Sequence, residues 1–229
     1  MRIDSLTSTA GHLILRPPVV VRSRGGEGQE VKSLGETPPI PLNLEDIGAL
    51  AKFFGPTGLV GRLRKRLNYL KRKKCIVIPA KGGNSCVDDE DVVYLGVDLL
   101  AAHLKEPETL AGVLAHEWGH ACALKPPQGA VQKLNWNQIF ELRRAHETLA
   151  DEIAGRLLFM MGFTTKGLIR FLTERKKDTH NLKYHAPEIR ARVIQYGFEV
   201  EKRKAELAKR LFSKSIYPDQ YRSILLDIA

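Results

Sequence analysis

The stretch Ala115-His116-Glu117-Trp118-Gly119-His120 decides how this chain is interpreted. His116 and His120 are four positions apart, so a helix presents both imidazoles on one face, one turn apart. Two neutral imidazoles at that spacing can bind one Zn²⁺ ion, and Glu117 beside them can accept a proton from water. The alternative is a surface helix that happens to carry two histidines, so the rest of the sequence has to decide.

A catalytic zinc site usually has three protein ligands and one open position for water. The metzincin motif is excluded as the source of the third ligand. That motif needs glycine and histidine three and six residues after His120, where this chain has Ala123 and Pro126. The third ligand is therefore expected elsewhere in the chain.

A predicted long helix over residues 135–161 supplies Glu147 as the third ligand. Asp151 follows one turn later on the same face, where it can accept the other ring N–H of His116 and fix the tautomer of that ligand. His146 is a rival ligand, but it lacks this supporting aspartate. An ordinary acidic helix surface is the alternative for Glu147 and Asp151 when they are considered without the upstream motif.

Length and composition place the chain among globular proteins. It has 229 residues and is 43% apolar, which allows one domain with a sizeable core. We see no apolar run near 18 residues and no secretory signal at the start, so no transmembrane helix is expected. Three cysteines (Cys75, Cys86 and Cys122) are interpreted as free thiols in a reducing compartment. A cytoplasmic location is therefore predicted.

The first third of the chain is irregular and then strongly basic. Residues 1–42 are rich in proline and glycine and are predicted to form a flexible arm. Helices are predicted over residues 43–54, where Asn43 is the N-cap, and from residue 59 onward. The second helix and its end carry Arg62, Arg64, Lys65, Arg66, Lys71, Arg72, Lys73 and Lys74. With a net charge of +10, this basic helix (residues 62–74) is either a solvated face or a contact for nucleic acid or an acidic membrane surface.

The remaining pattern predicts an α+β fold that is mostly α. β-Branched runs predict strands at residues 75–79 and 92–96, and a short helix follows at 99–104. Helices are then predicted from Pro107 through the histidine motif and at residues 135–161, 166–175, 187–212 and 217–229. We expect a small two- or three-stranded sheet packed against the motif helix. Residues 43–229 then form one domain, with a basic lead-in (43–74), a catalytic core (75–195) and C-terminal helices (196–229).

Several ordered blocks carry a family resemblance over residues 75–195. They are the strand and short helix at 92–100, the motif helix at 112–121, the stretch Glu147-Thr148-Leu149-Ala150-Asp151, and residues 157–163. Together they resemble the gluzincin metallopeptidases grouped with HtpX and the CAAX-prenyl endoprotease, including soluble relatives such as BepA and LoiP. This chain lacks the hydrophobic spans of the membrane-embedded members.

The resemblance implies a zincin-like core and a zinc endopeptidase that acts on proteins or peptides. One Zn²⁺ ion would be held by His116, His120 and Glu147, with Glu117 as general base. The substrate would bind as an added strand along the edge of one strand. That strand comprises Val92, Val93, Tyr94, Leu95 and Gly96.

The resemblance also points to an oxyanion-stabilising group after the long helix. The family often has a His-Pro segment followed by arginine, and this chain reads Tyr184-His185-Ala186-Pro187 with Arg190 and Arg192 behind it. His185 is the predicted oxyanion donor or positioning group, supported by Arg190 or Arg192. The alanine after the histidine departs from the family pattern, and a solvated loop at a helix start is the alternative.

Two other functions are compatible with the sequence. A DNA-associated protease resembling the SprT-type proteins would explain the basic helix, although such sites usually take a third histidine. A regulatory, peptidase-like protein would bind zinc without turnover, although a remnant of that kind would be expected to have lost Glu117. An ImmA/IrrE-like regulator would usually carry a helix-turn-helix, which we do not find.

Overall fold

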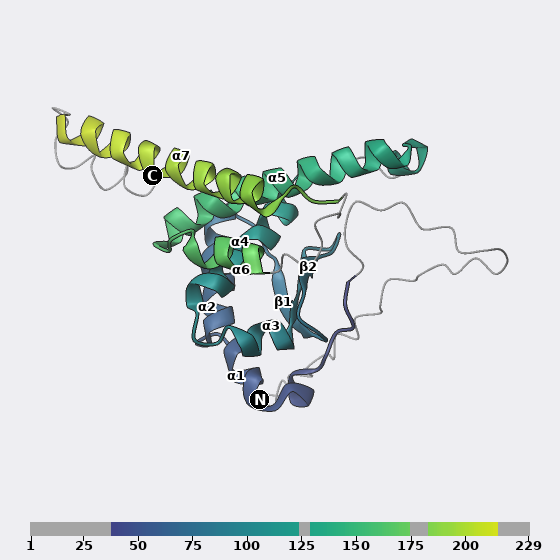
Figure 1. The fold of residues 1–229 in the computed structure, drawn as a ribbon. Coiled ribbons are helices and arrows are strands. Elements are labelled where there is room, and N and C mark those ends of the chain that lie inside the picture. Colours follow the sequence, from purple (N-terminus) through teal and green to yellow (C-terminus); the bar gives the residue numbers. More distant parts are fainter. Residues whose placement is uncertain (1–37, 124–128, 175–182, 215–229) are drawn as a thin grey trace, which may run out of the picture. The chain divides into compact units, whose positions relative to one another are not determined.

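The computed structural model describes residues 38–123, 129–174 and 183–214 (Figure 1). Within these ranges the chain is mostly helical and contains one three-stranded sheet, which confirms the predicted α+β, mostly α, composition. No helix in the described ranges is both long and apolar enough to cross a bilayer. Most of the predicted arm, residues 1–37, and the predicted helix 217–229 lie outside the described residues.

The elements follow the chain in the order expected from the sequence. They are η1 (Leu44–Leu50), α1 (Ala51–Phe54), α2 (Leu59–Lys71), β1 (Ile76–Ala80), β2 (Ser85–Val87), β3 (Val92–Gly96), α3 (Val97–Ala102), α4 (Pro107–Cys122), η2 (Val131–Lys133), α5 (Trp136–Met161), α6 (Lys166–Glu174) and α7 (Pro187–Lys214).

Helix α5 begins and ends where its sequence signals predict. The Asn135 side chain accepts a hydrogen bond from the backbone N–H of Gln138, and the Gln138 side chain accepts one from the Asn135 N–H. This reciprocal cap satisfies two N–H groups that have no partner within the helix. At the other end Gly162 has a φ of 81°, a left-handed conformation that favours glycine.

The prediction of one continuous helix over residues 43–54 is wrong. Asn43 and Asp46 do form the expected cap, since the Asp46 carboxylate accepts from Nδ2 of Asn43 at 3.0 Å. Gly48 then has φ 52° and ψ −126°, which interrupts the helix and separates the 3₁₀ turn η1 from α1. Glycine reaches this conformation without a Cβ penalty, so helical spacing alone did not reveal the break.

The sheet has the order β1-β3-β2, with β1 parallel and β2 antiparallel to β3. Strand β3 is therefore the central strand, and all five of its residues are buried. The prediction that Val92–Gly96 offers an open edge to a substrate is wrong, because both edges of β3 pair with other strands. The prediction failed because residues 85–87 form a strand too short to show an alternating pattern.

The two outer edges of the sheet differ. Along β1, the N–H of Leu42 donates to the carbonyl of Pro79, and the N–H of Lys81 donates to the carbonyl of Ile40, both at 2.9 Å. Residues 40–42, predicted as part of a flexible arm, therefore cover that edge. Along β2, hydrogen bonds to β3 alternate, so Ser85 and Val87 direct their backbone N–H and C=O groups to the outer side.

Helix α4 lies at the centre of the core and packs against α2, α5, α6 and β2. Trp118 is 0% exposed, and its Nε1 donates to Oδ1 of Asn68 in α2 at 3.2 Å. The same Asn68 side chain binds both the N–H and the C=O of Cys75, just before β1. One asparagine thus joins α2, β1 and the motif helix.

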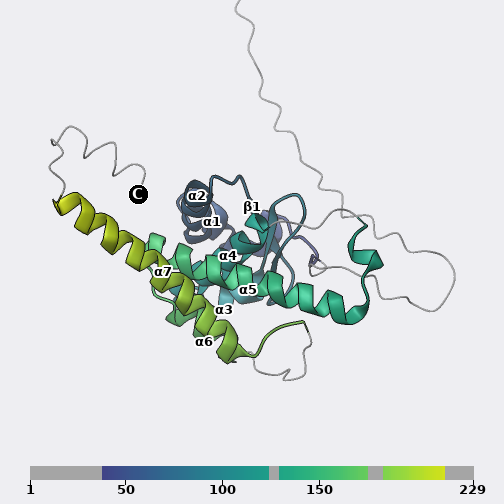
Figure 2. The same ribbon diagram turned by 90° about the horizontal axis from the view of Figure 1, so that it is seen from above.

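Small residues let the helices around the motif approach closely. A Cβ on Gly119 would lie 2.6 Å from Cα and 2.7 Å from the carbonyl oxygen of Ala150, so α4 and α5 touch through their backbones. Helices α5 and α7 cross in both views of the ribbon, where Gly155 packs on the backbone of Ile194 and Gly197 packs on that of Glu152 (Figures 1 and 2). These contacts bring α4, α5 and α7 together around the histidine motif.

Candidate metal centre

The structure brings the three predicted metal ligands together from two helices. Nε2 of His116 and Nε2 of His120, both on α4, are 3.1 Å apart. Glu147 on α5 completes a triangle, because its Oε2 lies 3.3 Å from Nε2 of His116 and its Oε1 lies 3.3 Å from Nε2 of His120. Among the described residues, these three form the group of metal-ligating atoms that lie within 4.8 Å of one another.

These separations fit a single small metal ion. Two ligand atoms about 2.0–2.1 Å from one Zn²⁺ ion at the tetrahedral angle lie roughly 3.3–3.4 Å apart. The observed edges of 3.1 and 3.3 Å are close to that value. In addition, Oε2 of Glu147 is buried and accepts no hydrogen bond of good geometry, although buried carboxylate oxygens normally have a partner. A cation is the partner that this arrangement lacks, so the residues fit a metal.

Asp151 and Arg190 lie behind the ligands. Oδ1 of Asp151 is 2.9 Å from Nδ1 of His116, and although this contact lacks good hydrogen-bond geometry, a small ring rotation would align it. A carboxylate at that position holds the proton on Nδ1 and leaves the lone pair of Nε2 directed at the metal-ligand group. Asp151 is 1% exposed, and Nε and Nη2 of Arg190 donate to its two carboxylate oxygens at 2.7 and 2.9 Å. Nη2 of Arg190 also lies 3.2 Å from Oε2 of Glu147.

The charges in this group shift one another's protonation. Burial alone would lower the pKa of His116, but hydrogen bonds and charge from Asp151 and Glu147 raise it to about 10. Burial would raise the pKa of Glu147, but His116 and His120 hold that pKa well below its usual 4.5. His116 and Arg190 likewise overcome burial to lower the pKa of Asp151. Without a metal, the group therefore holds two carboxylates and a protonated His116.

Glu117 occupies the position expected of a general base. It adjoins His116 on α4 and is 4% exposed. A buried carboxylate next to the ligands can accept a proton from water at the site. With the donor set of two imidazoles and one carboxylate, the arrangement has the parts needed to bind a metal and to move a proton.

The other sequence-predicted residues lie around this group. His146 is half-buried, and burial followed by the charge of His120 lowers its pKa, but the ligand position is taken by Glu147. His185 is partly exposed and precedes α7, and its role as oxyanion donor stays a prediction. Arg192 is exposed, whereas the Arg190 side chain is 11% exposed and stacks over Tyr184 at 5.4 Å.

Sequence reasoning missed the position that Arg190 takes. It was expected behind His185, near an oxyanion, and the structure places it behind Asp151 and Glu147 instead. One signal was present in the sequence. Arg190 shares a face of α7 with Ile194 and Gly197, four and seven positions later, and those residues are buried against α5.

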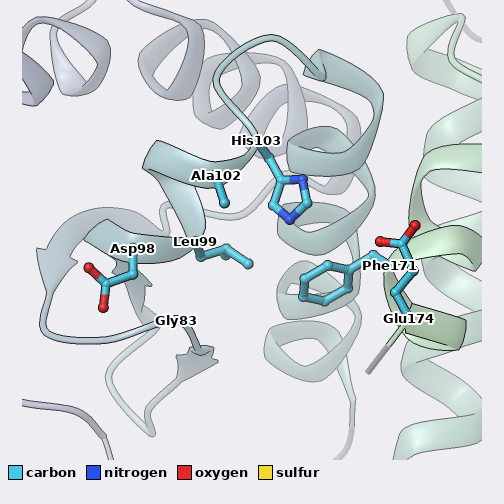
Figure 3. A pocket seen from close by; sticks show the side chains of 7 residues that line it. All are labelled: Gly83, Asp98, Leu99, Ala102, His103, Phe171 and Glu174. Carbon is cyan, nitrogen blue, oxygen red and sulfur yellow. The ribbon is translucent and has the colours of Figure 1, made fainter. Parts of the chain in front are cut away.

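A separate pocket of about 230 Å³ lies between α3 and α6 (Figure 3). The ring centroids of His103 and Phe171 are 5.6 Å apart, with an edge of one ring toward the other. Its lining consists of Gly83, Asp98, Leu99, Ala102, His103, Phe171 and Glu174. It shares no residue with the metal-ligand group and is therefore distinct from it.

Comparison with known protein families, with curated proteins and with solved structures finds no match to this chain. The functional argument therefore depends on the residues of the site itself.

Proposed function

We propose that this chain is a zinc-dependent endopeptidase of the gluzincin type, built on a zincin-like core. One observation carries the proposal: His116, His120 and Glu147 lie 3.1–3.3 Å from one another, with buried Glu117 on the same turn of α4. Two imidazoles and a carboxylate are ligands that suit Zn²⁺. The motif, the third ligand and the acid beside them match the residues on which the family resemblance depends.

The chain's own residues supply the proton transfers. A zinc ion bound at this group would polarise a peptide carbonyl and lower the pKa of a water molecule. The carboxylate of Glu117 accepts the proton of the attacking water and then delivers it to the leaving nitrogen. Asp151 keeps the proton of His116 on Nδ1, so Nε2 remains available as a ligand.

The outer edge of β2 is the proposed binding position for the substrate, in place of β3. Strand β2 packs against α4, so it lies beside the helix that carries the histidines. The outward backbone groups of Ser85 and Val87 can pair with an extended peptide as an added strand. Backbone pairing of this kind suits a protease because it is independent of the substrate's side chains.

The test measures metal content and peptide cleavage in the same preparations. The wild-type chain is loaded with zinc and incubated with a peptide library, beside Glu117→Gln and the control Glu141→Gln. Glu141 is an exposed acid on α5, so its replacement removes one carboxylate away from the site. We expect Glu117→Gln to keep its zinc and lose roughly 10²–10⁴-fold in cleavage rate, as is usual for removal of a general base. The control should retain both zinc and cleavage.

Each other outcome points to a different function. Bound zinc with no Glu117-dependent cleavage of any peptide would favour the regulatory binding protein. Cleavage that requires added DNA would favour the SprT-like alternative. A wild-type chain that binds no transition metal, while His116→Ala behaves identically, would overturn the proposal altogether.

A further inference from the structure

We infer that the outer face of α2 is a docking surface for an anionic phospholipid bilayer. This surface, called the α2 basic face, consists of Arg62, Lys65, Arg66, Tyr69, Arg72 and Lys74, all of which are exposed. The inference does not depend on the metal centre or on the proposed function, because none of these residues belongs to the site.

Positive charge on the α2 basic face is not balanced by the surrounding sequence. The chain contains no aspartate or glutamate between Asp46 and Asp88, and that interval holds ten lysines and arginines. They are Lys52, Arg62, Arg64, Lys65, Arg66, Lys71, Arg72, Lys73, Lys74 and Lys81. A concentration of one sign of charge attracts a surface of the opposite sign.

Most of these charges also lack acidic partners in the folded chain. Lys73 forms an ion pair with Asp91 at 2.9 Å, and Arg66 donates to the carbonyl oxygen of Met160. Within the described residues, Arg62, Lys65 and Arg72 have no ion pair. Their charges are therefore available to an external anion.

The shape of the surface favours a bilayer over nucleic acid. Val60, Leu63 and Leu67 are buried, so α2 is fixed along its inner face and only its outer half can meet a partner. A helix held in this way can lie on a flat layer of phosphates. It cannot enter the major groove, which is only about as wide as a complete helix with its side chains.

Tyr69 supplies the second feature that favours lipid. It is 72% exposed among the basic residues, and the Arg66 guanidinium lies 5.9 Å from its ring centroid. Tyrosine is enriched at the level of lipid headgroups, because its ring is apolar and its hydroxyl is polar. A bilayer offers both environments to this side chain, together with the anionic phosphates.

The experiment uses the full chain and sedimentation with lipid vesicles. One set of vesicles is phosphatidylcholine, and the other is phosphatidylcholine mixed with phosphatidylserine. The test variant Arg62→Gln/Lys65→Gln/Arg72→Gln removes three charges from the α2 basic face. The control Arg203→Gln/Lys204→Gln/Lys209→Gln removes three from exposed positions of α7. Thermal unfolding and metal content of each variant show that the fold is kept.

We expect the wild type to bind the vesicles that contain phosphatidylserine and to be released by added salt. Each basic residue near such a surface contributes roughly a fivefold gain in binding, so the α2 variant should bind roughly 100-fold more weakly while the α7 control changes little. Tyr69→Ala should weaken vesicle binding further. Equal losses in both triple variants, or no preference for phosphatidylserine, would overturn the inference. Tighter binding of double-stranded DNA, lost in the α2 variant, would overturn it in favour of nucleic acid.

Discussion

Arg190 and Asp151 are joined by two parallel hydrogen bonds of 2.7 and 2.9 Å, although 39 positions separate them in the sequence. The planar guanidinium matches both carboxylate oxygens, which fixes the direction of Asp151 as well as its distance. Since Asp151 faces His116, and Arg190 also approaches Glu147, this pair sets the orientation of two metal ligands on different helices.

Replacing Arg190 with lysine should therefore weaken metal binding. Lysine keeps the charge but cannot form the two-pronged contact. Loss of a residue that orients a ligand typically costs about 10–100-fold in metal affinity. Competition with a chromogenic chelator measures this affinity, and Arg192→Lys is the control because Arg192 is exposed. Equal affinities for the two variants would show that Arg190 does not position the ligands.

Metal affinity should increase with pH in the neutral range. In the metal-free chain the pKa of His116 is raised to about 10, so Nε2 carries a proton that a metal must displace. Release of one proton per ion predicts roughly a tenfold gain in affinity for each pH unit. Calorimetry in buffers of different ionisation enthalpy counts the released protons. Binding without proton release would mean that His116 is already neutral.

The metal-free chain should have a stability maximum in mildly acidic solution. The raised pKa of His116 contributes stability that is complete below its usual pKa of 6.5 and is lost as the pH rises toward about 10. The lowered pKa values of Glu147 and Asp151 contribute stability that is present above 4.5 and 3.8 and is lost at lower pH. Urea unfolding in a chelator, followed across pH, should show both limbs. In His116→Ala the loss on the alkaline side should shrink, and an unchanged alkaline limb would contradict this assignment.

Gly119→Ala should destabilise the fold although the change adds only one methyl group. The new Cβ would lie 2.6 Å from Cα of Ala150, and both atoms belong to helix backbones that cannot move independently. Overpacking of this kind usually costs about 1–3 kcal/mol. Chemical denaturation measures the change in unfolding free energy. Gly83→Ala is the matched control because nothing lies within 4 Å of its Cβ position, and a similar small effect for both would disprove the close contact.

The metal-ligand group could be predicted from sequence because each of its parts is local. His116 and His120 share a helix face by spacing alone, and Glu147 and Asp151 share one on the next long helix. The bounds of α5 were equally readable, since Asn135 and Gly162 mark its ends through their own side chain or backbone. Only the meeting of the two helices needed the structure.

Features that depend on contacts between distant segments could not be predicted in the same way. The order β1-β3-β2 follows from pairing choices that the strand patterns leave open, so β3 was expected at an edge. The position of Arg190 follows from the crossing of α5 and α7, which the sequence expresses only as glycines at Gly155 and Gly197. Charge alone gave Arg190 several possible partners.

The brevity of β2 has a consequence for what the chain can recognise. Three residues span about 10 Å, and only Ser85 and Val87 turn their backbone groups outward. A peptide held there is tested for whether it can straighten over a few residues, and its side chains play little part. Rigidly folded segments would be rejected by their shape, so a partner's local unfolding, more than its sequence, would decide whether it is accepted.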